Sequence, residues 1–194
     1  MFGINRLTPE LVLKAYAMGI FPMGGDFGEI RWYSPDPRCI FDLENFHVPK
    51  RLARTARKGI FELKVNTAWD DVVHRCADRD TTWITDQIFS VYTELHELGF
   101  AHSVEAYCEG QLAGGLYGVS IGGAFMGESM FHERTDASKI CLLYLVERLK
   151  SRGFVLLDCQ FMTPHLAKFG AINIPKSEYI DRLHRALALT CHFA

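Results

Sequence analysis

Two acidic residues follow apolar, strand-like runs in this sequence. Asp158 comes directly after residues 154–157, and Glu128 follows residues 124–127. Carboxyl groups at the ends of neighbouring strands face the crevice in which many α/β proteins bind ligands. Gln160 lies two residues beyond Asp158, so an extended chain directs both side chains to the same side. Because glutamine is a poor base, Asp158 and Gln160 together indicate a site that orients a substrate amine.

These residue types also have purely structural interpretations. A single acid at a strand end is more often a cap or one half of a buried ion pair than a functional group. Apolar residues belong to the core by default, although flexible methionine side chains also suit the wall of an apolar pocket. Five apolar residues on neighbouring predicted elements are candidates for such a wall: Leu116, Phe125, Met130, Leu145 and Leu157.

A cluster of basic residues lies between positions 50 and 58. Lys50, Arg51, Arg54, Arg57 and Lys58 fall in nine positions that contain no acid. On a helix, four of them share one face, where like charges repel unless an anion is bound. A solvated cationic face and a phosphate-binding stripe are equally good interpretations. The net charge of −2 argues against nucleic-acid binding by the whole surface but allows a local patch.

The composition is that of an ordinary globular protein. The 194 residues are 48% hydrophobic and 23% charged, so we expect one main domain with a small appendage. No apolar run is long enough to cross a bilayer, and residues 1–6 show no apolar segment typical of a secretory signal. The six cysteines form no Cys-x-x-Cys pair and the eight histidines have no ligand spacing. This pattern favours buried thiols in a reducing cytoplasm and argues against a metal site.

The elements that position these residues follow from periodicity and turn residues. Thr8 and Pro9 suit the start of a helix that Gly19 ends, and the Gly/Pro-rich residues 21–38 predict turns that carry aromatic side chains. Alternation and apolar spacing predict strands over 61–65, 102–108, 111–121, 124–130 and 154–157, and helices over 85–98, 136–152 and 177–189.

The order of these elements predicts the fold class. Three closely spaced strands with Gly-containing turns form an antiparallel meander. The helix between the last two strands acts as a crossover, so those two strands pair in parallel. The expected fold is therefore α+β, a mixed α/β layout with a mixed, largely antiparallel sheet, and it is compatible with the N-acyltransferase fold.

Several short motifs occur in a specific order over most of the chain, from about Leu7 to Leu183. They include Gly127–Phe131 and Leu157–Gln160. The others span residues 15–22, 32–38, 82–85, 95–99, 102–105, 114–119 and 137–139. No single motif is sufficient, but together they make the chain resemble the leucyl/phenylalanyl-tRNA–protein transferase family.

The resemblance implies a fold, a reaction and partners. A small N-terminal domain, residues 1–37, precedes an N-acetyltransferase-like catalytic domain, residues 38–194. The enzyme transfers leucine or phenylalanine, and less readily methionine, from aminoacyl-tRNA to the α-amino group of proteins that begin with Arg or Lys, in bacterial N-end-rule degradation. The activated ester supplies the driving force, so no cofactor or metal is implied. We expect a cytoplasmic monomer without membrane contact.

The family's functional positions fall on four groups of residues in this sequence. The acceptor site and catalytic pair fall on Glu128, Asp158 and Gln160. The pocket for the aminoacyl side chain falls on the five apolar residues named above. Contacts to the tRNA 3′ adenosine fall on Tyr16, Met23 and Trp83, and contacts to tRNA phosphates fall on Lys50, Arg54 and Arg57.

Two departures from the family pattern bear on specificity. Met23 stands where a tryptophan is usual, so stacking on the adenine is either weaker or rebuilt with Trp32 or Tyr33. Leu145 and Leu149 occupy positions that are often aromatic. The preference among Leu, Phe and Met therefore stays open.

Two other functions fit parts of the sequence. An acyl-CoA-dependent N-acetyltransferase holds pyrophosphate with a Gly-rich turn at a helix N-terminus, but no glycine occurs between Gly127 and Gly153. The corresponding turn, residues 132–136, is acidic and bulky, which argues against this function. A non-catalytic module that binds tRNA or peptide would use the basic cluster and the aromatic residues equally well.

Overall fold

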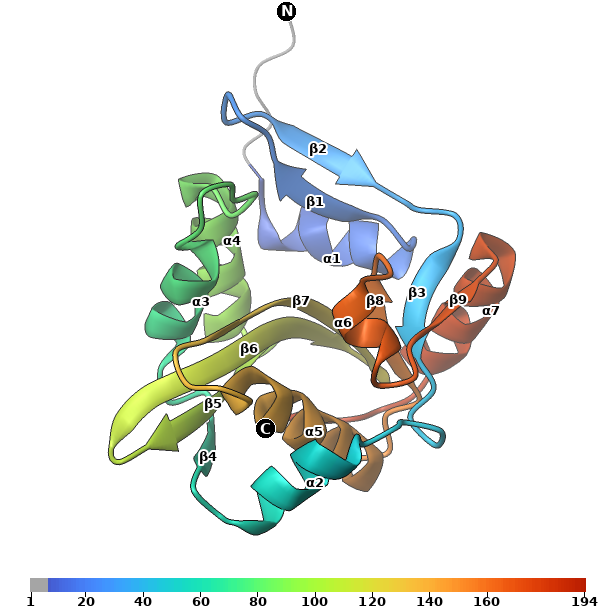
Figure 1. Cartoon of the computed structure of the whole chain (residues 1–194). Helices are drawn as coiled ribbons and strands as arrows, with labels where there is room; N and C mark the ends of the chain where they lie inside the picture. The colour runs from blue at the N-terminus through green and yellow to red at the C-terminus, as the bar shows by residue number, and fades with distance from the viewer. Residues whose placement is uncertain (1–6) are drawn as a thin grey trace, which may run out of the picture.

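A seven-stranded sheet forms the centre of the computed structural model, which describes residues 7–194 (Figure 1). Residues 1–6, where no secretory signal is predicted, lie outside the described part. The strands are ordered β4-β5-β6-β7-β8-β3-β9. They comprise β3 (Arg38–Phe41), β4 (Glu62–Val65), β5 (Ala101–Cys108), β6 (Gln111–Ile121), β7 (Ala124–His132), β8 (Leu156–Gln160) and β9 (Ile172–Ile174).

The predicted fold class is confirmed by the pairing of these strands. All neighbours are antiparallel except β7 and β8, which pair in parallel as the crossover helix requires. The sheet is therefore mixed and largely antiparallel. The helices are α1 (Pro9–Ala17), α2 (Lys50–Arg57), α3 (Trp69–Ala77), α4 (Asp86–Glu97), α5 (Ala137–Ser151), α6 (Pro164–Ala167) and α7 (Lys176–Leu187).

Helices cover both faces of the sheet and divide the core into two layers. Side chains alternate along β6, so Tyr117 and Val119 join one layer and Leu116 joins the other. Helices α1, α3, α4 and α7 contribute to the first layer, and α2 and α5 to the second. None of the helices within residues 7–194 is long and apolar enough to cross a membrane.

The N-terminal segment differs from its prediction in part. The first helix is confirmed, because Thr8 caps α1 by accepting a hydrogen bond from the Leu11 N–H at 3.3 Å. Residues 21–33, predicted as turns, instead form a separate hairpin of β1 (Phe21–Gly24) and β2 (Ile30–Tyr33). The glycines and Pro22 concealed it, although proline is tolerated in an edge strand. Tyr16 and Phe21 pack into the first core layer, and the division at residue 37 stays a prediction.

Two strands extend beyond their predicted ends, and one extension changes the setting of Asp158. β8 continues to Gln160, so Asp158 lies within its strand rather than after its end. β7 continues to His132, two residues past the predicted strand 124–130 that already contained Glu128. Apolar patterning ends where the polar site residues begin, although the backbone continues to pair. Elements α3, β3, α6 and β9, which the sequence analysis did not predict, complete the layers.

Candidate active site

The polar site lies where the two parallel strands separate. β7 and β8 are in register from Ala124 and Leu156 to Met126 and Asp158. On its other side, β7 pairs with β6 through Gly127 and Ser129 but leaves Glu128 as an unpaired extra residue. Such a bulge bends the strand and redirects a side chain. The backbone itself therefore turns Glu128 out of the ladder at the point of separation.

Gln160 connects the two acids. Its φ of 64° takes the residue out of the extended conformation at the end of β8. Its backbone N–H donates to Asp158 Oδ1 at 2.9 Å, and its side-chain Nε2 donates to Glu128 Oε1 at 3.1 Å. The three residues that the sequence singled out are thus brought together, with Gln160 in the middle.

Asp158 is an anchor inside the protein. Arg38 binds both of its oxygens, with Nε 2.8 Å from Oδ1 and Nη2 2.6 Å from Oδ2. The Tyr179 hydroxyl donates to Oδ2 at 2.8 Å, and the guanidinium of Arg38 lies 4.6 Å from the centre of the Tyr179 ring. Asp158 is fully buried and does not line the cavity described below. A substrate therefore has no open path to this carboxylate.

Glu128 is the carboxylate that faces the cavity. The Tyr16 hydroxyl donates to its Oε1 at 2.5 Å, and the Tyr92 hydroxyl lies 3.5 Å from its Oε2. Burial raises the pKa of Glu128 to about 7, while the hydrogen bonds from Tyr16 and Gln160 oppose that rise. A carboxylate with this pKa exchanges protons readily near neutral pH.

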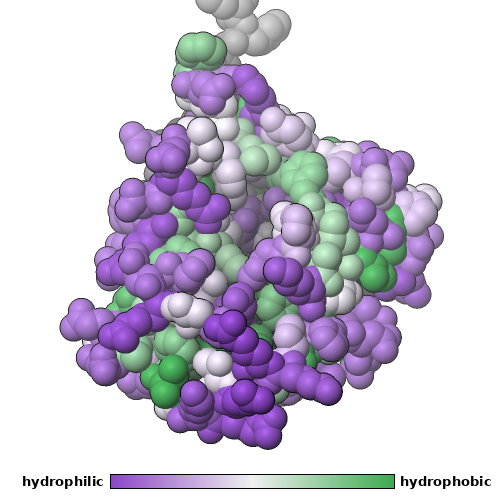
Figure 2. Space-filling view, in the orientation of Figure 1, coloured by the Kyte–Doolittle hydropathy of each residue, from purple (hydrophilic) through white to green (hydrophobic). Residues whose placement is uncertain are grey.

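Most of the predicted apolar wall surrounds one cavity of about 360 Å³ beside Glu128. It receives Leu116, Met130, Leu145 and Leu157 from four different elements, β6, β7, α5 and β8. Figure 2 shows a hollow bordered by apolar side chains in the middle of the visible face. Phe125 is an exception, because its ring is buried 5.1 Å from the ring of Phe193 and does not line the cavity.

The residues predicted to contact an adenosine divide into two groups. Met23 and Trp83 line the cavity, and the Gly24 N–H donates to the Trp83 carbonyl oxygen at 2.9 Å, which ties β1 to the loop before α4. Tyr16 does not fit this role, since only 1% of it is exposed and its hydroxyl is bound to Glu128. Its ring has no free face on which a base could stack.

Aromatic and cationic residues that the sequence analysis missed also line the cavity. Phe161 is 44% exposed and lines the cavity, whereas Trp32 and Tyr33 do not. The one feature of the sequence that could have indicated Phe161 as a site residue is its position directly after Gln160. Arg79 also lines the cavity and donates to the Met130 carbonyl oxygen at 2.6 Å. It comes from a polar loop without a recognisable pattern.

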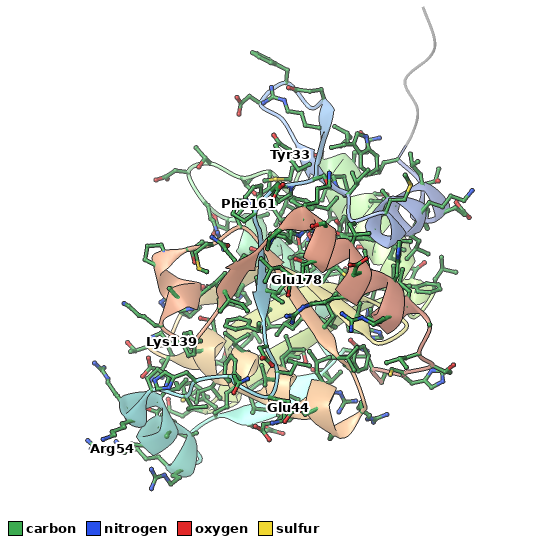
Figure 3. The ribbon with its side chains drawn as sticks, turned by 90° about the vertical axis from the view of Figure 1, so that its right-hand side faces the viewer. Tyr33, Glu44, Arg54, Lys139, Phe161 and Glu178 are labelled. Carbon is green, nitrogen blue, oxygen red and sulfur yellow. The ribbon has the colours of Figure 1, made fainter. Side chains whose placement is uncertain are left out.

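The basic cluster lies apart from this cavity on α2. Leu52 is buried and holds the helix against the protein, while Lys50, Arg54 and Arg57 are exposed. Within residues 7–194, none of these three forms an ion pair. Arg54 projects away from the body of the molecule (Figure 3). The structure thus presents an unneutralised basic face but brings none of it into the cavity.

Comparisons with known proteins give this site its context. The sequence model described as leucyl/phenylalanyl-tRNA protein transferase matches residues 40–184, and the model of its N-terminal domain matches residues 5–36. The chain belongs to this transferase family. A leucyl/phenylalanyl-tRNA–protein transferase from Rubrobacter xylanophilus is 53% identical over 190 residues, which cover 97% of this chain and all of the relative. The transferase from Gloeobacter violaceus is 52% identical over 188 residues, 96% of this chain and 97% of the relative.

Membership of the transferase family confirms the expectation of an aminoacyltransferase, with aminoacyl-tRNA and protein as its substrate classes. Among solved structures, a GCN5-related N-acetyltransferase-like protein from Streptococcus suis aligns with 85% of this chain and 63% of that chain, at 12% identity and a TM-score of 0.44.

Proposed function

We propose that this transferase moves leucine or phenylalanine, and less readily methionine, from aminoacyl-tRNA to the α-amino group of proteins that begin with Arg or Lys. The product would mark those proteins for N-end-rule degradation in a bacterial cytoplasm. The observation that carries the proposal is a single carboxylate, Glu128, beside an apolar cavity. Among the described lining residues, Glu128 is the one acid. A hydrocarbon side chain and a cationic amine are the two groups that such a site binds together.

The cavity determines how the donor is held. In our proposal the aminoacyl side chain lies against Leu116, Met130, Leu145 and Leu157, and the 3′ adenosine lies near Met23 and Trp83. Phe161 supplies the further aromatic surface that the departure at Met23 calls for, because it lines the same cavity and is partly exposed. The ester carbonyl then lies between the apolar wall and Glu128, within reach of an amine held by the acid.

The reaction is aminolysis of an ester, and its protons must balance. The acceptor attacks the carbonyl carbon as a neutral amine, and the bond to the ribose oxygen breaks. Glu128 receives the proton that the nitrogen loses and returns it to the ribose oxygen as that oxygen leaves, so Glu128 ends the cycle as it began. A typical α-amine has a pKa of roughly 7.7–8.0, so a carboxylate with a pKa of about 7 is well matched to it.

Gln160 and Asp158 support this transfer without donating or accepting the reacting proton. The amide nitrogen of Gln160 is bound to Glu128, which leaves its carbonyl oxygen as an acceptor for the amine. Asp158 holds the backbone of Gln160 and is itself neutralised by Arg38. We therefore assign Asp158 the role of an electrostatic anchor rather than that of a base.

The basic face of α2 is proposed to contact tRNA phosphates. Lys50, Arg54 and Arg57 are exposed and have no acidic partner in the described chain, so an anion would relieve their mutual repulsion. The distance of α2 from the cavity suits a contact with the body of the tRNA rather than with its aminoacylated end.

The proposal is tested with leucyl-tRNA and peptides that begin with Arg, Lys or Ala. Mass spectrometry should show addition of one leucyl residue to the Arg and Lys peptides but not to the Ala peptide. Glu128→Gln should lower the rate by about 10²–10⁴, the range for loss of a general base. Equal modification of all three peptides would contradict the proposed acceptor, and full activity of Glu128→Gln would remove this residue from the mechanism.

A further inference from the structure

We propose that Tyr16 and Tyr92 are positioning residues, which hold Glu128 by its Oε1 oxygen and leave Oε2 as the oxygen that meets the acceptor amine. This inference rests on the proposed role of Glu128. It replaces the contact to the tRNA 3′ adenosine that the resemblance implied for Tyr16, and it gives a role to Tyr92, for which the sequence analysis proposed none.

The hydrogen bonds have a definite direction. Tyr16 donates its proton to Glu128 Oε1 at 2.5 Å, so its own oxygen remains free to accept. The Tyr92 hydroxyl lies 2.5 Å from the Tyr16 hydroxyl and therefore donates to it. The chain runs from Tyr92 through Tyr16 to Glu128, and each bond polarises the next.

The two oxygens of Glu128 differ in their surroundings. Oε1 accepts from Tyr16 and also from Gln160 Nε2 at 3.1 Å. Oε2 has the Tyr92 hydroxyl at 3.5 Å, which is beyond the usual 2.5–3.0 Å for such a bond, and that proton is already committed to Tyr16. Oε2 thus retains the capacity to accept a proton, while Oε1 fixes the orientation of the carboxylate.

The buried phenols are well suited to remain donors. Burial raises the pKa of both Tyr16 and Tyr92, so both keep their protons at neutral pH. Tyr117 provides a contrast in the same core layer, because its hydroxyl is equally buried yet has no hydrogen-bond partner. The pairing of Tyr16 and Tyr92 with Glu128 is therefore specific and does not follow from burial alone.

The charged and titratable groups around Glu128 determine how a tyrosine variant changes its pKa. Arg38 acts on it from β3, but Asp158 neutralises that charge at 2.6 Å. Removing the Tyr16 donor withdraws stabilisation from the charged carboxylate, so the pKa of Glu128 should rise. The titratable or charged groups that face it are Tyr16 from α1, Tyr92 from α4, Tyr117 from β6, Asp158 from β8, Arg38 from β3 and Arg79 from the loop after α3.

The test is a titration of the Glu128 carboxyl by ¹³C NMR in the full chain, together with the pH dependence of kcat/KM. Tyr16→Phe should raise the midpoint by about one pH unit or more, since a hydrogen bond to a charged group contributes ~1.5–3 kcal/mol and one unit equals ~1.36 kcal/mol. Tyr92→Phe should raise it by less. Tyr117→Phe, the matched control, removes a nearby buried hydroxyl that makes no hydrogen bond, so it should shift the midpoint less than either of the other two variants.

The outcomes separate this inference from the proposed function. An unchanged midpoint in Tyr16→Phe, or an equal shift in Tyr117→Phe, would overturn the positioning role of the tyrosines. A midpoint that moves while the acid limb of kcat/KM stays would instead overturn proton transfer by Glu128 Oε2. If Tyr16→Phe fails to fold, the titration of Tyr92→Phe becomes the deciding measurement. An unchanged Glu128 midpoint in Tyr92→Phe would then contradict the inference.

Discussion

Glu128 makes the stability of the folded chain depend on pH. Its pKa rises from an ordinary 4.5 to about 7 on folding. The folded state therefore binds the proton more tightly, and the stability that this contributes is present below about pH 4.5 and is lost as pH rises through about 7. The loss is on the order of 3 kcal/mol. Since Glu128→Gln cannot ionise, its stability relative to the natural chain should improve from pH 5 to pH 8 in urea unfolding. Parallel stability curves would contradict this.

Arg38 and Asp158 form a buried ion pair that is costly to break from one side. Both are almost fully buried, and Arg38 spans both oxygens of Asp158. Arg38→Met leaves a buried carboxylate without its partner, so we expect a loss of about 3–5 kcal/mol. Adding Asp158→Asn should recover part of this loss, because the charge is gone.

The matched control for that pair is an exposed one. Arg134 and Glu109 form an ion pair in which both side chains are more than half exposed. Arg134→Ala should change the free energy of unfolding by no more than about 1 kcal/mol in urea titrations. An equal loss in Arg38→Met and Arg134→Ala would show that burial of the Arg38 pair contributes nothing special.

Strands and helices with a clear period were predictable, whereas the local irregularities that make the site were not. Thr8 caps α1 as expected, α4 lies within the helix predicted over 85–98, and the meander of β5, β6 and β7 lies where alternation placed it. The bulge at Glu128 and the positive φ of Gln160 break the strand pattern. Both depend on neighbouring strands, so no local propensity in the sequence reports them.

The proposed contact of helix α2 with tRNA phosphates can be tested by the salt dependence of tRNA binding. Lys50→Ala/Arg54→Ala removes two phosphate-binding side chains, so the slope of log affinity for tRNA against log salt concentration should fall by about 1.4–1.8. Activity at saturating tRNA should change little, because α2 contributes no residue to the cavity. Lys14→Ala/Arg185→Ala removes two exposed charges from α1 and α7 as a control. An equal slope change in both double variants would show a general charge effect.

The assembled molecule brings together residues that no linear pattern connects. Arg38 and Asp158 are 120 positions apart, and Tyr16 and Glu128 are 112 positions apart. The sequence indicated each acid as a candidate and the resemblance supplied its role. However, the partners that hold each acid come from separate elements, with β3 and α7 supplying those of Asp158 and α1 and β8 supplying those of Glu128, so they follow only from tertiary packing.

The cavity wall, built from several elements, should set the choice of amino acid. Leu145 projects from α5 into the cavity opposite strands that contribute Met130 and Leu157. Leu145→Phe removes volume, so phenylalanine should lose more than leucine in transfer from a mixture of both aminoacyl-tRNAs. One methylene group more or less in a hydrophobic pocket changes the preference between two substrates by about 10–200-fold. We therefore expect the Phe/Leu product ratio to shift by at least about tenfold. Leu145→Ala should shift the ratio in the opposite direction.

Leu149 supplies the control for this shift. It lies one turn further along the same helix, is fully buried and does not line the cavity. Leu149→Ala should therefore destabilise the fold by about 2–5 kcal/mol while leaving the Phe/Leu ratio unchanged. A ratio that moves equally in Leu145→Ala and Leu149→Ala would mean that specificity follows from overall stability. In that case the side-chain subsite must be sought outside this wall.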